Sequence, residues 1–145
     1  MSAAAVQFFM PTENSRPDFS GVWEWNSAKS ATRGPMPERM VVTIEHREPQ
    51  LVQHVVTTGA DGSERSQTFH IDTGGETTNS AGGATLRTRS RWEGAELVIE
   101  SWLPTPQREF HFKDHWSLSE DGRTLTMAHR DDDLAGQIAV LDRVS

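Results

Sequence analysis

Ten short segments in which apolar and polar residues alternate constrain the fold of this chain more than any other feature. Turn-forming residues, mostly glycine, proline and Asp-Gly pairs, separate the segments. Alternation with a period of two is typical of half-buried β-strands, and closely spaced turns favour antiparallel hairpins over parallel strands joined by helices. The segments span residues 20–26, 39–47, 51–58, 64–72, 76–80, 85–92, 96–103, 108–118, 124–131 and 137–143. Apart from one helical turn that residues 27–32 could form, the sequence predicts an all-β protein.

The order of the segments favours a closed barrel over a two-sheet sandwich. Neighbouring segments are joined by short connections and no long crossover is needed, as in an up-and-down barrel. Closure also removes the edge strands that an open sheet of this length would expose. We therefore expect an antiparallel up-and-down barrel of 8–10 strands, formed by residues 19–145 as a single domain. Residues 1–18 are expected to be an N-terminal tail or a lid.

The first and last predicted strands carry a tryptophan and an arginine that are expected to meet. Residues 21–23 read Gly-Val-Trp, and Arg143 lies at the end of the last segment. At these positions the chain resembles lipocalin-type (calycin) barrels, in which Gly-x-Trp opens the first strand and a basic residue of the last strand packs on the tryptophan. Over residues 19–143 the chain is similar to small bacterial lipocalin-like domains, which share the pattern Gly-x-Trp-x-x-Asn-x-x-Lys-Ser near the start and Trp-x-Leu-Ser-x-Asp-Gly-x-Thr-Leu-Thr near the end. The glycine-rich opening motif of nitrobindin-like haem barrels is absent. The resemblance implies a barrel with a cavity, but it implies no reaction.

The composition narrows the partners and compartments that we expect. A net charge of −7 disfavours nucleic acid and anionic membranes as partners. No apolar run approaches the ~20 residues of a membrane helix, and residues 1–10 lack the basic start of a secretion signal. The absence of cysteine excludes disulfides and thiolate chemistry. These features predict a cytoplasmic protein and leave a homodimer open.

Residues 110–131 are predicted to form a hairpin around an Asp-Gly turn. Its apolar residues share one face only if Leu118 lies opposite Leu125. The same register places Asp114 opposite His129, with their Cα atoms roughly 5 Å apart and both side chains directed to the apolar side. An acid and an imidazole that meet on an apolar wall are the chief chemical constellation of this sequence.

The predicted pair has a functional and a structural interpretation. A carboxylate can fix the tautomer of a histidine and raise its basicity, so Asp114 and His129 could act as an acid/base pair. Alternatively, the two side chains only satisfy each other's hydrogen bonds. Asp131 could complete a metal site with them, but one imidazole and two carboxylates are a weak metal signal, and we expect no metal. His111 and His115 take the solvent side of the strand about 13 Å apart, so they should not share a zinc ion.

The phase of the remaining hairpins predicts which side chains point inward. A Gly94-Ala95 loop pairs Trp92 with Leu97, and an Asp61-Gly62 loop would place His54 inside. Segment 39–47 then requires the opposite phase, which a β-bulge near Pro49 would repair. The side chains expected to enclose a ligand are Trp23, Trp25, His54, Phe69, Ser90, Trp92, Ile99, Phe112, Trp116 and Met127.

Three arginines on one predicted strand bear on the charge of a ligand. The phase of Arg87, Arg89 and Arg91 opposes that of Trp92, so they are expected on the outer face. If they lined the interior instead, the ligand would be an anion, as in fatty-acid-binding barrels.

Two functions follow for such a barrel. The first is a cofactor-free enzyme, of the lyase, isomerase or cyclase type, that acts on a small apolar or aromatic molecule through Asp114 and His129. No glycine elbow marks a serine nucleophile, and no nucleotide-binding loop is present. The alternative is a non-catalytic barrel that carries a hydrophobic ligand. The lack of an export signal favours the enzyme.

Overall fold

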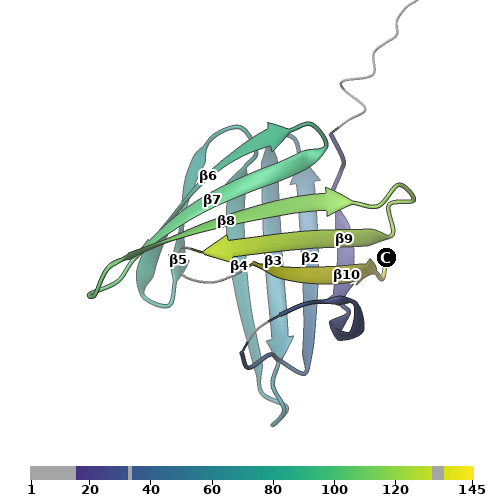
Figure 1. The fold of residues 1–145 in the computed structure, drawn as a ribbon, viewed down its shortest axis with the longest axis horizontal. Helices are drawn as coiled ribbons and strands as arrows, with labels where there is room; N and C mark the ends of the chain where they lie inside the picture. Colours follow the sequence, from purple (N-terminus) through teal and green to yellow (C-terminus); the bar gives the residue numbers. More distant parts are fainter. Residues whose placement is uncertain (1–15, 33, 132–135) are drawn as a thin grey trace, which may run out of the picture.

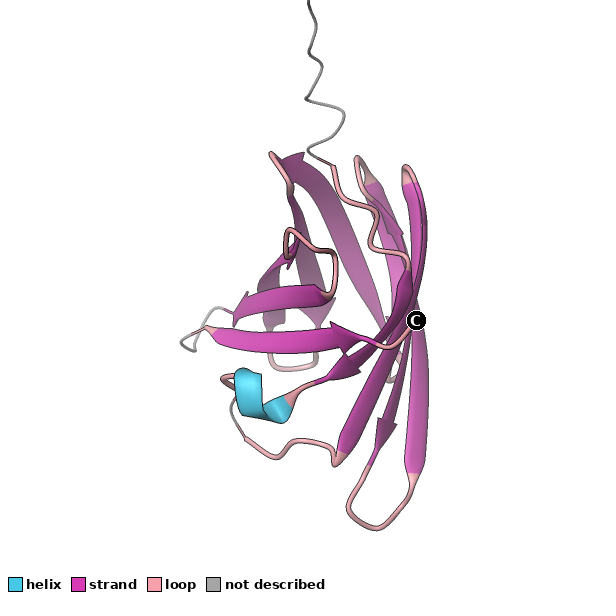
Figure 2. Cartoon of the chain, turned by 90° about the vertical axis from the view of Figure 1, so that its right-hand side faces the viewer, coloured by secondary structure: helices cyan, strands magenta, loops and turns pink. Residues whose placement is uncertain are grey.

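The structure is a computed structural model, and it describes residues 16–32, 34–131 and 136–145. Ten antiparallel strands form one sheet that curls into a nearly closed barrel (Figures 1 and 2), which confirms the predicted fold class. The helix η3 (Ser27–Lys29) forms at the predicted turn and packs beside the last strand. The strands are β1 (Gly21–Trp25), β2 (Arg39–Arg47), β3 (Gln50–Thr58), β4 (Glu64–Asp72), β5 (Glu76–Ala81), β6 (Ala84–Glu93), β7 (Glu96–Pro104), β8 (Glu109–Leu118), β9 (Thr124–Asp131) and β10 (Gln137–Arg143).

The sheet order leaves one seam in the barrel wall. Each strand pairs with its neighbours in the order β4-β3-β2-β1-β10-β9-β8-β7-β6-β5, so the pairing of β1 with β10 joins the two ends of the chain. Strands β4 and β5 form the two edges of the sheet, and no backbone ladder joins them in the described part of the chain. Side chains bridge this seam instead. The Asn79 amide accepts a hydrogen bond from the His70 N–H at 2.7 Å and donates one to the His70 carbonyl at 3.0 Å.

Trp23 is the centre of the core where β1 meets β10. Its side chain is fully buried, and its indole N–H donates to the Phe19 carbonyl at 3.0 Å. Arg143, its partner on β10, places its guanidinium carbon 4.3 Å from the ring centroid. The contact expected from the lipocalin-type pattern is therefore confirmed.

A hydrogen-bonded cluster around Glu48 fills the same end of the barrel. The Glu48 carboxylate lies 2.7 Å from His46 Nε2 and accepts hydrogen bonds from Thr73 at 2.8 Å and Trp92 at 3.1 Å. Because the Phe19 N–H donates to His46 Nδ1, the proton of this imidazole lies on Nε2. Burial raises the pKa of Glu48, but the three hydrogen bonds outweigh it and hold that pKa below its usual value. The barrel interior is thus occupied by side chains at this end.

Strand β3 corrects one of the sequence-based expectations. Segment 39–47 points inward as expected, through residues such as Ile44, and it needs no bulge, because the Glu48-Pro49 turn pairs Arg47 directly with Gln50. The wrong phase was that of β3, on which Leu51 and not Val52 lies inside. A loop of residues 59–63, rather than two residues, joins β3 to β4 and shifts the register by one residue.

Two further observations concern the rest of the chain. The predicted tail, residues 1–18, lies outside the described residues as far as residue 15. None of the helices that the structure describes has the length and apolar character needed to cross a membrane.

Candidate functional site

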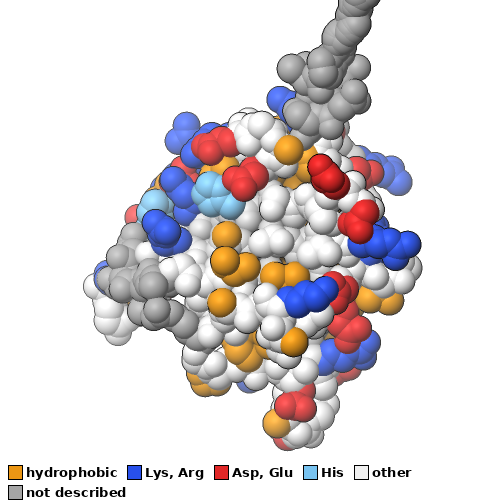
Figure 3. Space-filling view, turned by 45° about the vertical axis from the view of Figure 1, so that its right-hand side comes forward, with side chains coloured by type: hydrophobic (Ala, Val, Ile, Leu, Met, Phe, Trp, Pro, Cys, Tyr) orange, Lys and Arg blue, Asp and Glu red, His pale blue; other side chains and the backbone are white. Residues whose placement is uncertain are grey.

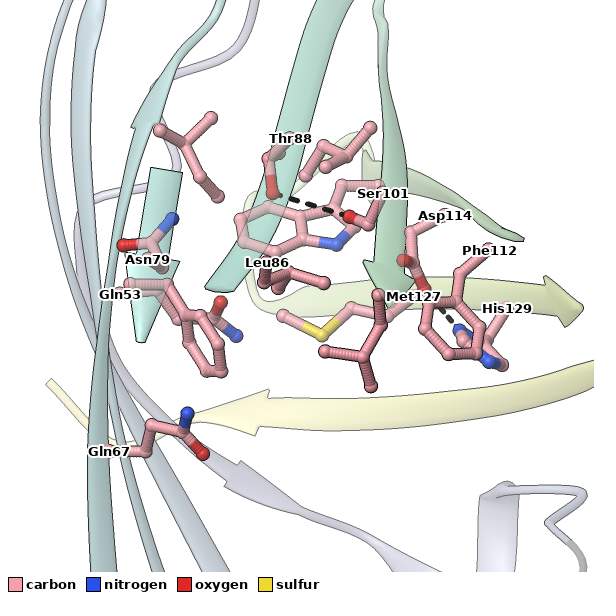
Figure 4. A pocket seen from close by; sticks show the side chains of 15 residues that line it. Gln53, Gln67, Asn79, Leu86, Thr88, Ser101, Phe112, Asp114, Met127 and His129 are labelled. Atoms are coloured by element: carbon pink, nitrogen blue, oxygen red, sulfur yellow. Dashed lines mark hydrogen bonds and ion pairs between the residues drawn. The ribbon is translucent and has the colours of Figure 1, made fainter. Parts of the chain in front are cut away.

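Strands β8 and β9 bring Asp114 and His129 together in the predicted register. Leu118 pairs with Leu125, and Trp116 pairs with Met127. Two residues further along each strand, Asp114 lies opposite His129. The imidazole Nδ1 is 2.8 Å from a carboxylate oxygen of Asp114 (Figure 4). The side chain of His129 is 33% exposed and that of Asp114 is 25% exposed, so the pair is not sealed in the core.

The surroundings of His129 determine its charge and its tautomer. The hydrogen bond to Asp114 is the largest influence and raises the pKa of His129; burial opposes it, and the charges of Asp114 and Asp131 add to it. Since Nδ1 donates to Asp114, the neutral imidazole presents the lone pair of Nε2. The Nε2 atom makes no hydrogen bond to another described residue. A ligand that reaches this nitrogen would therefore meet no competing partner among the described residues.

A cavity of about 290 Å³ lies beside the pair. Figure 4 shows side chains from both halves of the sheet converging on it. Its apolar lining residues are Phe69, Ile71, Leu86, Ile99, Leu103, Phe112, Trp116 and Met127. Its polar lining residues are Gln53, Gln67, Asn79, Thr88, Ser101, Asp114 and His129. The site is thus an apolar chamber with a few polar groups, as is usual for small-molecule sites.

The structure brings half of the predicted wall to this cavity. Phe69, Ile99, Phe112, Trp116 and Met127 line it. The other predicted residues that point inward lie in or against the core, away from the cavity lining: Trp23, Trp25, Ser90 and Trp92.

His54 is the one predicted wall residue that lies on the outer surface. It is exposed and bonded to Thr68 Oγ1 at 2.8 Å, so its predicted inward placement was wrong. The cause is the one-residue shift of β3.

Three carboxamides in the lining add to the predicted wall. Gln53 was missed because the phase of β3 was misjudged, although the alternative phase that starts at Leu51 would have placed it inside. Asn79 was missed because nearly all residues of β5 are polar, so no alternation of apolar and polar residues indicates which of them point inward. Gln67 is exposed but lines the cavity on the same face as Phe69 and Ile71, as the alternation along β4 predicts.

The arginine row lies on the outer face, as its phase predicts. Arg91 pairs with Glu100 at 3.1 Å, and Arg87 packs over Trp102 at 4.3 Å. His111 and His115 also lie on the outer surface and contact Glu100 and Glu96, respectively. Within the described ranges, no three His, Cys, Asp or Glu side chains come together as metal ligands. Elsewhere on the surface, acidic and basic side chains lie close to one another (Figure 3), as Arg39 and Glu24 do at 2.7 Å.

Comparison with known proteins identifies the fold. No protein-family model matches the sequence, and no curated protein sequence matches it. Secretory abundant heat soluble protein 4 from Ramazzottius varieornatus superposes with a TM-score of 0.67 and 13% identity, over 97% of this chain and 100% of its own. A Schistosoma mansoni fatty acid binding protein, solved in complex with arachidonic acid, has a TM-score of 0.59 and 13% identity over 90% and 99%. A mutant of the fluorescent protein UnaG gives 0.60 and 12% over 88% and 96%. The chain therefore has the lipocalin-like (calycin) barrel fold, and identities this low carry nothing further.

Proposed function

We propose that this protein binds a small hydrophobic molecule inside its barrel. The observation that carries the proposal is the cavity of about 290 Å³ with a mainly apolar lining. Its volume is near the lower end of the roughly 300–1,000 Å³ typical of ligand pockets, so the ligand should be small. Aromatic side chains such as Phe69, Phe112 and Trp116 offer large apolar contact surfaces to it. The fatty acid binding protein with the same fold was solved in complex with arachidonic acid, a molecule with a long hydrocarbon chain, which supports this use of the barrel.

Filling the cavity should abolish this binding. Ser101 lines the cavity and is 7% exposed, so Ser101→Phe would occupy ligand space. We expect the affinity for a neutral apolar dye such as Nile red to fall at least about tenfold, because the apolar contacts of the dye are lost. Fluorescence titration of purified protein measures the affinity, and mass spectrometry of molecules extracted from the protein identifies a natural ligand.

The matched control is Ser117→Phe, which introduces the same side chain on the outer face of β8, opposite Thr126. The control should bind the dye as the wild type does. Equal dye affinity in wild type and Ser101→Phe would remove the cavity as the binding site.

Acid/base catalysis on the bound molecule is a second candidate function. The geometry of Asp114 and His129 favours it, because the carboxylate holds Nδ1 and both side chains line the cavity. The reaction would be a cofactor-free proton transfer of the lyase, isomerase or cyclase type. His129 would take the proton, and Asp114 would orient the imidazole and stabilise its charged form.

Asp114→Asn tests the pair at the level of protonation. The main cause of the raised pKa of His129 is removed, and burial then favours the neutral imidazole against only the charge of Asp131, so we expect that pKa to fall. Titration by NMR measures the shift. A general base must be neutral, so wild-type turnover should decline as the pH falls through the pKa of His129, and in Asp114→Asn this decline should move to lower pH.

His129→Ala should reduce turnover by about 10²–10⁴-fold while the ligand affinity stays within a few-fold. His111→Ala, which removes an imidazole from the outer face, is the control and should leave turnover unchanged. Turnover that survives in both Asp114→Asn and His129→Ala would make the pair structural.

A further inference from the structure

Apart from Thr88 and Ser101, which hydrogen-bond to each other at 3.4 Å, the polar side chains of the cavity form two groups on opposite sides of a mainly apolar middle. Figure 4 shows Asp114 and His129 on one side and three carboxamides, which we call the amide group, on the other. The amide group consists of Gln53 on β3, Gln67 on β4 and Asn79 on β5. Apolar side chains, including Met127 and Leu86, lie between the two groups (Figure 4). A molecule that spans the cavity would therefore meet a polar group at each end.

Both groups have hydrogen-bonding capacity that the protein does not use. Asn79 is engaged with the His70 backbone, and the Gln67 Nε2 donates to the Ser80 carbonyl at 3.0 Å, which leaves the Gln67 Oε1 as an acceptor. The half-buried Gln53 carboxamide makes no hydrogen bond within the described residues. On the opposite side, His129 Nε2 makes no hydrogen bond to another described residue. Since half-buried polar groups gain when a ligand supplies their partners, each end favours a ligand atom that can form hydrogen bonds.

The charges of the cavity disfavour an anionic ligand. None of its lining residues is lysine or arginine, and Asp114 contributes a carboxylate. Asp131 adds a second negative charge close to His129. If His129 is protonated, its positive charge is already paired with Asp114 at 2.8 Å. A free carboxylate in this chamber would lose its hydration without gaining a cation of its own.

We infer that the ligand is an uncharged molecule with an apolar middle and a hydrogen-bonding group, such as a hydroxyl, at each end, and that free fatty acids bind poorly. This inference rests on the proposed function, because it names the class of hydrophobic molecule that the cavity selects. The amide group binds one end, and the pair of Asp114 and His129 binds the other. The chemistry differs from that of a barrel whose interior is cationic.

Three series of linear probes test the inference: alkanols, alkanediols with a hydroxyl at each end, and alkanoates, each from butyl to decyl. Calorimetry and intrinsic tryptophan fluorescence, to which Trp116 in the cavity wall contributes, report binding to the full chain near neutral pH. At the best chain length the diol should bind about fivefold more tightly than the alkanol, the worth of one net hydrogen bond. The alkanoate should bind at least about tenfold more weakly than the alkanol.

Gln53→Leu should abolish the advantage of the diol over the alkanol, because the amide group loses the carboxamide that makes no hydrogen bond within the described residues. Gln50→Leu is the matched control, since Gln50 lies on the same strand, is exposed and does not line the cavity. The control should retain the full advantage. Circular dichroism confirms that both variants are folded.

Three results would separate failure of this inference from failure of the proposed function. Alkanoates that bind as tightly as alkanols overturn the inference, and a loss of that binding in Arg65→Gln would place the anion beside Arg65, which lies near Gln67 and Phe69. A diol with no advantage over the alkanol also overturns it. In both cases hydrophobic ligand binding survives. Failure of every probe, neutral ones included, to bind would overturn the proposed function itself.

Discussion

Replacing Trp23 with alanine is expected to lower the free energy of unfolding by about 3–5 kcal/mol, as truncation of a fully buried tryptophan does. The side chain is 0% exposed, and its ring packs under the Arg143 guanidinium. The variant would lose these contacts, leave a cavity and free the Phe19 carbonyl of its indole donor. Because β1 is the strand that joins β2 to β10, weak packing there also weakens the closure of the barrel. Urea denaturation followed by tryptophan fluorescence and circular dichroism measures the change.

Trp102→Ala is the control for this prediction. Trp102 lies on the outer face, where it stacks with His111 at 5.2 Å and under Arg87 at 4.3 Å. Exposed cation–π contacts contribute about 0.5–1 kcal/mol, so the control should lose far less stability than Trp23→Ala. Comparable losses in the two variants would show that Trp23 does not anchor the core as we describe.

The candidate pair could be predicted from the sequence because one hairpin has a single consistent register. On β8 and β9, the turn and the pairing of Leu118 with Leu125 leave no alternative that keeps the apolar residues on one side. Asp114 and His129 then follow without any knowledge of the rest of the barrel. The packing of Arg143 on Trp23 was predictable for a different reason, the resemblance of both strands to a family pattern.

The phase of β3 could not be predicted because both of its faces carry apolar residues. Leu51 and Val55 lie inside, whereas Val52 and Val56 lie half-buried on the outer face, so alternation favours neither phase. The loop before β4 gives no help, since Gly59 and Gly62 both suit a turn and the observed loop is longer than the shortest one. This error affected the predicted site, because the one-residue shift places Gln53 in the cavity wall instead of His54.

The way in which the edges β4 and β5 are joined could not be predicted from the sequence for a more general reason. Closure of a barrel was expected to be by backbone pairing, but the two edges here are joined by side chains. An inward asparagine such as Asn79 has no apolar pattern that would reveal it, and its role depends on the distance to His70 across the seam. Only the three-dimensional arrangement of the two edges shows that a carboxamide stands in for a β-ladder.

Asn79→Leu is expected to destabilise the protein by about 1–3 kcal/mol, because the His70 N–H would be left unpaired while the His70 carbonyl would keep only the Thr77 hydroxyl. Asn79 is 8% exposed, so leucine of similar size keeps the packing volume but excludes water from the unpaired N–H. Chemical denaturation measures the loss, and hydrogen exchange should show faster exchange of the His70 amide than in the wild type.

Thr77→Val separates this effect from a general weakening of β5. The Thr77 hydroxyl donates to the same His70 carbonyl at 2.7 Å, but it is an exposed bond and Asn79 still pairs both His70 groups. Its removal should therefore cost less than about 1 kcal/mol. If Asn79→Leu were no more destabilising than Thr77→Val, the seam would be held by contacts other than the Asn79 carboxamide. A much larger loss of stability in Asn79→Leu would instead mean that the Asn79 side chain takes the place, between β4 and β5, of the backbone hydrogen bonds that join the other neighbouring strands. The wall of the ligand cavity would then depend on this side chain.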